Sequence, residues 1–297
     1  MSLYGGIEAG GTKFACAVGS DPRRILSETT IPTTNPNETI ERVIQFFLKI
    51  QEENAITAIG LGSFGPLDLD RTSPTFGYVR NTPKPGWANT RIVGEIGEAL
   101  GVPIVFDTDV NVAALGEATW GNGQDCDPLL YLTVGTGIGG GLIIHETPFH
   151  GLIHPEMGHI RVPHDWNRDP FPGTCIHHGD CFEGLASGPA LHQRWGTPGE
   201  LLPTDHEAWI LEADYLAIAV TNLIFTLSPK RIILGGGVMQ RTELLVNVRC
   251  KMRELLNGYF EHKLLRDEIA EYVTSPKLGN RSGVLGAIAL ARKACES

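Results

Sequence analysis

The stretch LYGGIEAGGTKFACAV, residues 3–18, places a glycine turn between two short apolar runs. Short apolar runs bounded by glycine are typical of β-strands. The segment EAGGTK, residues 8–13, therefore predicts a tight hairpin turn, in which glycine permits positive φ and close backbone approach. Successive free amides in such a turn can hold phosphate oxygens, and Thr12 and Lys13 add donors. Taken alone, a simple hairpin turn is the better explanation of this stretch.

Two further glycine clusters follow apolar runs. TVGTGIGGG, residues 133–141, fits the dinucleotide pattern G-x-G-x-x-G, but that pattern needs a helix after the glycines. The following GLIIHE is typical of a strand, so we expect a second hairpin and no dinucleotide fold. The third cluster, residues 235–237, ends the run RIIL before a helix and suits a flat ring resting on exposed backbone. Two hairpins facing each other across a cleft would clamp a polyphosphate.

Helices and strands alternate between these clusters. Helical spacing connects the apolar positions Ile40, Val43, Ile44, Phe47 and Leu48. Asn35 and Pro36 predict the start of this helix, with Asn35 as its cap. Strands are expected near 58–62 and 102–107, helices near 90–100 and from 111, and a long buried helix near 208–228. The pattern predicts two related α/β domains, beginning near Leu3 and Leu129, with a ligand between them.

Composition narrows the class of protein. The chain has 297 residues, 42% hydrophobic and 20% charged, which fits an ordinary globular protein of two domains. A net charge of −10 argues against nucleic acid as a partner. No apolar run approaches the length of a membrane span, and the N-terminus lacks signal-peptide features. We therefore expect a reducing, cytoplasmic setting and no membrane partner. Four of the six cysteines are scattered, which does not fit a secreted disulfide framework.

A cluster of short polar side chains follows one predicted strand. In FDTDVN these are Asp107, Thr108, Asp109 and Asn111, at the strand end where α/β folds bind ligands. One of them should cap the next helix, but capping needs only one short side chain. A carboxylate at this place can accept a proton from a hydroxyl that attacks a γ-phosphate.

The loop GTCIHHGDCFEG, residues 173–184, contains the spacing C-x-x-H-x-x-C. Cys175, His178 and Cys181 would supply three metal ligands, with His177 as the competitor of His178. The fourth ligand would be His154 or His159. Four sulfur and nitrogen ligands are typical of a closed, structural zinc site, which activates no water. Glu156 and Glu183 flank the ligands, and carboxylates fixed in this way can bind the hydroxyl groups of a sugar.

Taken together, these segments resemble the ROK family of sugar kinases and repressors. GGIEAGGTKFACAV, GSFGPLDL, TPKPGW, DTDVNVAALGE, LTVGTGIGGG, HPEMGHIRV, the C-x-x-H-x-x-C loop and LGGGVM all resemble the bacterial fructokinase branch. The resemblance covers essentially the whole chain. It implies a two-domain actin/hexokinase (ribonuclease H-like) α/β fold, with nucleotide and sugar bound in the cleft between the domains. Residues 1–113 with 283–297 would form the first domain, and residues 114–282 the larger second domain.

The resemblance also implies roles for particular residues. Asp109 matches the catalytic base. Positions that match sugar-binding residues are Gly65, Pro66, Asp109, Glu156, His159 and Glu183. Positions that match ATP-binding residues are Gly10, Gly11, Thr12, Lys13, Thr133, Gly135, Thr136, Gly137, Pro189, Gly235, Gly236, Gly237, Val238 and Met239. Positions that match zinc ligands are His159, Cys175, His178 and Cys181.

The activity implied by the resemblance is ATP-dependent phosphorylation of fructose at its 6-hydroxyl, with Mg²⁺ as cofactor, structural Zn²⁺ and a homodimer. Mannokinase or glucokinase activity and a non-catalytic sugar sensor are the alternatives. Glu8 stands where most relatives carry Asp, and Thr108 stands where the family glucokinases carry Asn. The second difference removes an amide from the sugar pocket and favours fructose over glucose. We expect no N-terminal DNA-binding module, because the first phosphate turn begins near residue 8.

Overall fold

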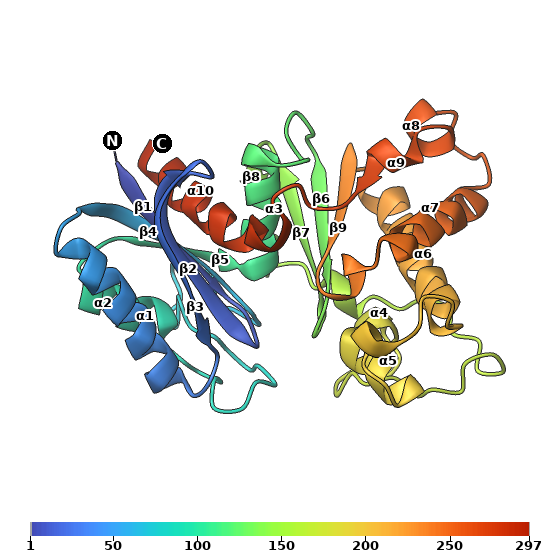
Figure 1. Ribbon diagram of the computed structural model, residues 1–297, viewed down its shortest axis with the longest axis horizontal. Coiled ribbons are helices and arrows are strands. Elements are labelled where there is room, and N and C mark those ends of the chain that lie inside the picture. The colour runs from blue at the N-terminus through green and yellow to red at the C-terminus, as the bar shows by residue number, and fades with distance from the viewer. Residues whose placement is uncertain (1, 297) are drawn as a thin grey trace. The chain divides into compact units, whose positions relative to one another are not determined.

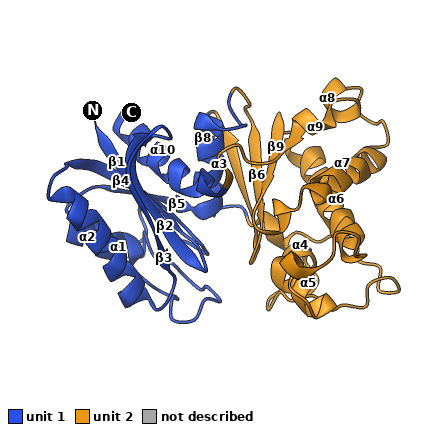
Figure 2. Ribbon diagram, viewed as in Figure 1, with its two compact units in different colours: residues 1–124, 146–155, 280–297 blue, residues 125–145, 156–279 orange. Residues whose placement is uncertain are grey.

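The computed structural model describes residues 2–296 and divides into two compact units (Figure 2). The first unit comprises residues 1–124, 146–155 and 280–297, and the second comprises residues 125–145 and 156–279. Each unit has a mixed β-sheet and a hydrophobic core of its own. The expected ranges, 1–113 with 283–297 and 114–282, differ from these units: position 113 falls inside a helix that packs entirely within the first unit.

The sheet of the first unit has the strand order β3-β2-β1-β4-β5. Its strands are β1 (Leu3–Ala9), β2 (Lys13–Asp21), β3 (Arg24–Pro32), β4 (Ile56–Ser63) and β5 (Ile104–Thr108). The strands β1, β2 and β3 are antiparallel, whereas β4 and β5 run parallel to β1. The first glycine turn therefore joins a β-hairpin, as the sequence predicted. The short strand β8 (Thr147–Pro148) lies in the 146–155 segment.

Helices cover both faces of this sheet (Figure 1). On one face lie α1 (Pro36–Gln51) and α2 (Ile92–Leu100), and on the other lie α3 (Asp109–Trp120) and α10 (Ser282–Glu296). Two glycines of β1 let the helices approach, because successive residues of a strand point to opposite faces. A Cβ atom added at Gly5 would lie 2.8 Å from the Phe47 ring of α1, and one added at Gly6 would overlap the Val284 carbonyl of α10.

The start of α1 confirms the sequence prediction. The side chain of Asn35 accepts the Glu38 N–H at 3.0 Å, and Pro36 occupies the first helical position. Ile40, Val43 and Phe47 are buried against the sheet. Local sequence therefore determines this helix completely, since cap, proline and apolar stripe all agree.

In the second unit, β10, β9, β6 and β7 pair in that order. Its strands are β6 (Leu129–Val134), β7 (Ile138–Ile144), β9 (Arg231–Gly235) and β10 (Val273–Thr274). Its helices are α4 (Phe182–Ala186), α5 (Gly188–Trp195), α6 (Ala208–Leu227), α7 (Thr242–Leu256), α8 (Lys263–Arg266) and α9 (Ile269–Tyr272). Its short 3₁₀ helices are η1 (Met157–His159), η2 (Gly199–Leu201) and η3 (Val238–Gln240). A further 3₁₀ helix, η4 (Gly279–Arg281), begins at the last residue of the second unit and continues into the first. As in the first unit, a glycine hairpin is followed by a parallel strand.

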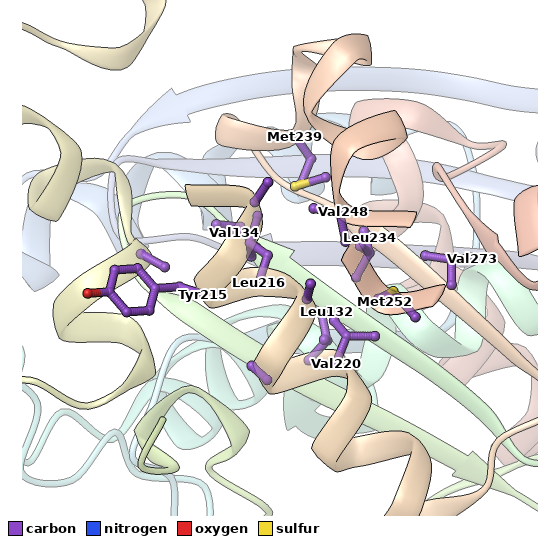
Figure 3. Close-up of a cluster of buried hydrophobic side chains, with 14 of the residues drawn as sticks. Leu132, Val134, Tyr215, Leu216, Val220, Leu234, Met239, Val248, Met252 and Val273 are labelled. Carbon is purple, nitrogen blue, oxygen red and sulfur yellow. The ribbon is translucent and has the colours of Figure 1, made fainter. Parts of the chain in front are cut away.

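The core of the second unit lies between this sheet and the helices α6 and α7 (Figure 3). Leu132 and Leu234 of the strands contact this core together with Leu216, Val220 and Val248 of the helices. The helix α6 is long and apolar enough to cross a membrane by length and composition, but 61% of its most apolar window is buried inside the protein. Its apolar character is therefore explained by core packing, as expected for the long helix near 208–228.

Candidate active site

Three segments with expected roles meet at one edge of the first unit's sheet. The strand register pairs Ala9 with Ser63 and Ser63 with Thr108, so the carboxyl ends of β1, β4 and β5 are neighbours. The segments that follow are the turn at residues 10–13, the turn at residues 65–66, and the helix α3, which begins at Asp109. Ligands of α/β sheets bind at the carboxyl ends of parallel strands.

The 10–13 turn has its carbonyl groups occupied. The Gly10 N–H donates to the Lys13 carbonyl oxygen at 3.0 Å. Thr33, next to the end of β3, occupies two more carbonyls: its Oγ1 donates to the Gly10 oxygen at 2.8 Å, and its N–H donates to the Thr12 oxygen at 2.9 Å. The turn therefore has few acceptors left that would repel an anion.

Lys84 brings a positive charge to the same turn. Its Nζ donates to the Gly11 carbonyl oxygen, and its side chain is half-buried. Within residues 2–296, the amides of Gly11 and Thr12 have no hydrogen-bond acceptor. Free amides beside an ammonium group are donors of the kind that can bind a phosphate oxygen. Sequence reasoning missed Thr33 and Lys84, because they lie 23 and 73 residues from the carbonyls they contact.

The polar side chains after β5 make different hydrogen bonds and therefore have different roles. The Asn111 N–H donates to Thr108 Oγ1 at 3.2 Å, so Thr108 is the residue that caps α3. Asp107 is buried and accepts hydrogen bonds from the Thr108 N–H and from Asn111 Nδ2, both at 2.7 Å. Asp109, at the start of α3, accepts the Val110 N–H at 2.9 Å. Since Thr108 is the cap of α3, the carboxylate of Asp109 is not needed for capping and is available to accept a proton.

Two carboxyl groups at this edge have raised pKa values. Burial raises the pKa of Asp109 to about 6, although the Val110 N–H opposes the shift. Burial, and then the negative charge of Asp109, raises the pKa of Glu8 to about 7, while Lys13 opposes the shift. Glu8 lies against Gly283, where an added Cβ atom would overlap the carboxyl group. Near neutral pH, Asp109 is mostly ionised yet basic enough to accept a proton from a hydroxyl.

The 65–66 turn is held by backbone contacts on either side. The Arg80 N–H donates to the Pro66 carbonyl oxygen at 2.7 Å. The Leu67 N–H donates to Nε2 of His154 at 3.1 Å. His154, one of two candidates for the fourth metal ligand, thus has a different role within the first unit.

The second unit contains the second glycine hairpin. Val134 of β6 pairs with Ile138 of β7 in an antiparallel ladder, so a strand follows the glycines and the dinucleotide fold is excluded, as expected. The Gly135 N–H donates to the Gly137 oxygen at 2.9 Å. The Gly135 oxygen accepts the N–H of Gly188, the first residue of α5, at 2.8 Å.

A cavity of about 950 Å³ is lined by this hairpin and by α5. The expected ATP-binding residues that line it are Gly135, Thr136, Pro189, Gly237 and Val238. Trp209 and Arg241 also line it, and the Arg241 guanidinium lies 4.2 Å from the Trp209 ring centroid. Arg241 donates to the Leu202 carbonyl at 2.8 Å, which fixes this wall. Sequence reasoning missed Trp209 and Arg241, because nothing in the sequence around them indicates a binding site.

Other residues expected at the ATP site lie outside the lining of this cavity. Thr133 and Gly235 pair across the parallel strands β6 and β9. Gly236 has a φ of +94°, and an added Cβ atom would overlap the backbone of Val134. Met239 is buried in the core (Figure 3). These residues lie next to the lining residues in the chain and set the course of the backbone there.

Four potential metal ligands of the second unit converge. The ligand atoms of His159, Cys175, His178 and Cys181 all lie within 4.8 Å of one another. His159 Nδ1 is 3.5 Å from the Cys181 sulfur and 3.8 Å from the Cys175 sulfur, and His178 Nδ1 is 3.6 Å from the Cys175 sulfur. Tetrahedral zinc with ordinary bond lengths separates a nitrogen and a sulfur ligand by about 3.6 Å. The residues therefore fit a zinc ion, with His159 and His178 as the histidine ligands.

The two flanking glutamates both belong to the second unit. Glu183, in α4, accepts the Ile138 N–H at 2.9 Å, and Gly137 leaves room for it, since an added Cβ atom would lie 2.7 Å from the carboxylate. The carbonyl oxygen of Glu156 accepts the His159 N–H at 3.0 Å. The second glycine hairpin, the metal loop and both carboxylates are thus connected by hydrogen bonds and short chain segments.

Comparison with known proteins identifies the family and agrees with the fold described above. The model of the ROK family matches residues 4–294. A fructokinase from Zymomonas mobilis subsp. mobilis is 46% identical, over 97% of this chain and 96% of that protein. A ROK hexokinase from Thermus thermophilus has a TM-score of 0.79 at 28% identity and covers 99% of both chains. A ROK family glucokinase from Streptomyces griseus, solved with glucose and AMPPNP, has a TM-score of 0.78 at 27% identity, over 98% of this chain and 100% of that one. These matches confirm the expected actin/hexokinase-type α/β fold, and the chain belongs to the ROK family.

Proposed function

We propose that the protein is an ATP-dependent fructokinase that converts D-fructose to fructose 6-phosphate. The observation that carries the proposal is Asp109, a carboxylate whose pKa is raised to about 6 at the ligand-binding edge of the sheet. The identity of 46% to a fructokinase, against 27% to the structurally similar glucokinase, supports fructose as the acceptor.

In the proposed reaction, the Asp109 carboxylate accepts the proton of the sugar's 6-hydroxyl. The oxygen attacks the γ-phosphorus of ATP, and the bond from that phosphorus to the bridging oxygen breaks, which releases ADP. Mg²⁺ bound to ATP would neutralise charge on the phosphates. The chain itself must position the nucleotide and sugar and supply one base of suitable pKa.

The nucleotide would be bound by both glycine hairpins. The free amides of Gly11 and Thr12 and the cation of Lys84 support a phosphate site at the 10–13 turn, with Gly10 and Lys13. The cavity supports an adenosine site. The proposed adenosine-side residues are Pro189, Gly235, Gly236, Gly237, Val238 and Met239, and we add Trp209 and Arg241 from the cavity lining. The second hairpin, with Thr133, Gly135, Thr136 and Gly137, would bind phosphate.

The sugar would be bound by the 65–66 turn, Asp109 and the polar side chains of the metal loop region. Glu156, His159 and Glu183 would accept or donate hydrogen bonds to its hydroxyl groups. Zinc held by His159, Cys175, His178 and Cys181 would fix these side chains structurally, because four protein ligands leave no position for water. The homodimer and the cytoplasmic location rest on the family resemblance.

An initial-rate panel of fructose, mannose and glucose with ATP tests the proposal. We expect the highest kcat/KM for fructose. Asp109→Asn should reduce kcat by about 10²–10⁴-fold with folding intact, whereas Asp70→Asn, at an exposed site, should not. Preference for mannose or glucose would reassign the substrate. Near-normal turnover of Asp109→Asn would remove Asp109 as the base, and fructose binding without ADP release by the wild type would indicate a sensor.

A further inference from the structure

His154 joins two segments of the first unit that are 87 residues apart in the chain. Its Nε2 accepts the Leu67 N–H at 3.1 Å, and the residue is only 5% exposed. Gly65 lies against the same ring, since a Cβ atom added there would be 3.5 Å from Cε1 of His154. The imidazole therefore binds the residue after Pro66 and lies beside the residue before it.

The protonation state of His154 follows from its partners. Nε2 must be unprotonated to accept the Leu67 N–H. The proton of the neutral ring then lies on Nδ1. Burial lowers the pKa of His154, and His150 acts in the same direction, while the negative charge of Asp107 opposes the shift. The ring is thus a neutral acceptor near neutral pH.

Among residues 2–296, His154 is the acceptor of the Leu67 N–H, and the neighbouring backbone bonds use other groups. Leu67 is buried, and its isolated β-bridge partner is Val79. In that bridge the hydrogen bonds run from the Arg80 N–H to the Pro66 oxygen and from the Asp68 N–H to the Tyr78 oxygen, so the Leu67 N–H is left to His154. A buried N–H without an acceptor is costly. Removal of the imidazole would therefore break the hydrogen bond that holds Leu67, the residue that follows the 65–66 turn.

We propose that His154 is a positioning residue for hexose binding, which fixes the 65–66 turn through the Leu67 amide. The inference rests on the proposed function, in which Gly65 and Pro66 line the sugar pocket. His154 also precedes Glu156 by two positions in the chain, so one hydrogen bond connects the turn to the segment that carries a second proposed sugar ligand.

The test compares His154→Leu with His154→Gln. Leucine cannot accept the Leu67 N–H, whereas glutamine can, because its Oε1 reaches about as far as Nε2. We expect His154→Leu to raise the KM and the calorimetric Kd for fructose by roughly tenfold, with kcat and the KM for ATP within about twofold of wild type. His154→Gln should restore most of the affinity for fructose.

His262→Leu is the matched control. His262, in the second unit, also accepts a backbone N–H through its imidazole, that of Leu264 at 3.3 Å. It should leave fructose binding unchanged. If His154→Leu does not fold, His154→Asn takes its place, since the shorter amide cannot reach Leu67.

The proposal is overturned if the variant without an acceptor binds fructose as wild type does, if His154→Gln loses as much affinity as that variant, or if the KM for ATP rises equally. Failure of the proposed function has a different signature, because the wild type itself would then not phosphorylate fructose.

Discussion

At the scale of single residues, the site depends on how four neighbouring polar side chains divide their tasks. Thr108 caps α3 and Asp107 accepts hydrogen bonds from its neighbours, which leaves the Asp109 carboxylate for the proton transfer that we propose. The sequence predicted that one of the cluster would cap and another would act as base. Which residue caps depends on side-chain direction at the strand end, and the fold decides that direction.

Glu8 provides a prediction about stability and pH. Its folded pKa of about 7 exceeds the ordinary value of 4.5, so the folded protein binds more protons than the unfolded chain between these values. Its contribution therefore lowers the free energy of unfolding as pH rises through this window. We expect Glu8→Gln to raise the unfolding temperature by at least about 2 °C at pH 8, and to change it little at pH 4.

Thermal unfolding at both pH values measures this effect, with exposed Glu53→Gln as the control. An equal change at pH 4 and pH 8 would show that packing of Glu8 against Gly283, and not its charge, determines the result.

At the scale of elements, the two glycine hairpins and the metal loop are the informative units. Both hairpins were predicted from apolar runs around glycine, and the ladders β1–β2 and β6–β7 confirm them. The spacing C-x-x-H-x-x-C left the histidine ligands open. His159 and His178 lie with the two sulfurs, whereas His154 binds the Leu67 amide. Spacing limits which residues can converge, but the path of the chain selects among them.

The metal loop leads to a prediction about zinc content. The wild type should contain about one zinc per chain, and Cys181→Ser should lose it, because three ligands hold zinc much less tightly than four. Metal analysis by mass spectrometry of the purified protein measures the content. Cys250→Ser is the control, since Cys250 is exposed on α7 and is not among the four ligands. Unchanged zinc in Cys181→Ser would refute the assignment.

At the scale of the whole molecule, the C-terminal helix α10 packs against the sheet that the N-terminal strands form. The helix α10 packs on α3 and on the strands β1, β2 and β4 of the first unit. This packing is unusually close at glycines: a Cβ atom added at Gly60 would overlap the Ala287 carbonyl, and one added at Gly286 would overlap the Val112 carbonyl. One face of the first sheet is therefore buried mainly by residues from the far end of the sequence.

Removal of residues 280–297 should for this reason abolish cooperative unfolding of the first unit. The truncated chain would lose the buried side chains Val284, Leu285 and Ile288 of α10 and expose the sheet face that carries Gly6 and Gly60. Each large apolar side chain lost from the interior is worth about 1.5–3 kcal/mol. Near-ultraviolet circular dichroism and a thermal scan measure the outcome. Removal of 294–297 is the control, since residues 294–296 are exposed. A natively folded chain without α10 would contradict the role assigned to this helix.

The sequence by itself determined the elements whose signals are local. Glycine between apolar runs specifies a hairpin, and Asn35 and Pro36 specify the start of α1, because turn conformation and capping act over a few residues. The clustered cysteines and histidines predict a metal loop, and their ligand atoms lie together in the structure. The family resemblance added the expected roles of the site residues.

Only the tertiary structure decided the contacts between distant segments. It brought Thr33 and Lys84 to the 10–13 turn, placed Arg241 over Trp209, and gave His154 to the Leu67 amide. Each of these contacts joins residues 20 or more positions apart, and no periodicity or turn pattern encodes such a partner. The hydrogen bonds among them form because sheet register and helix packing bring donor and acceptor together, and an unpaired polar group in the interior costs free energy.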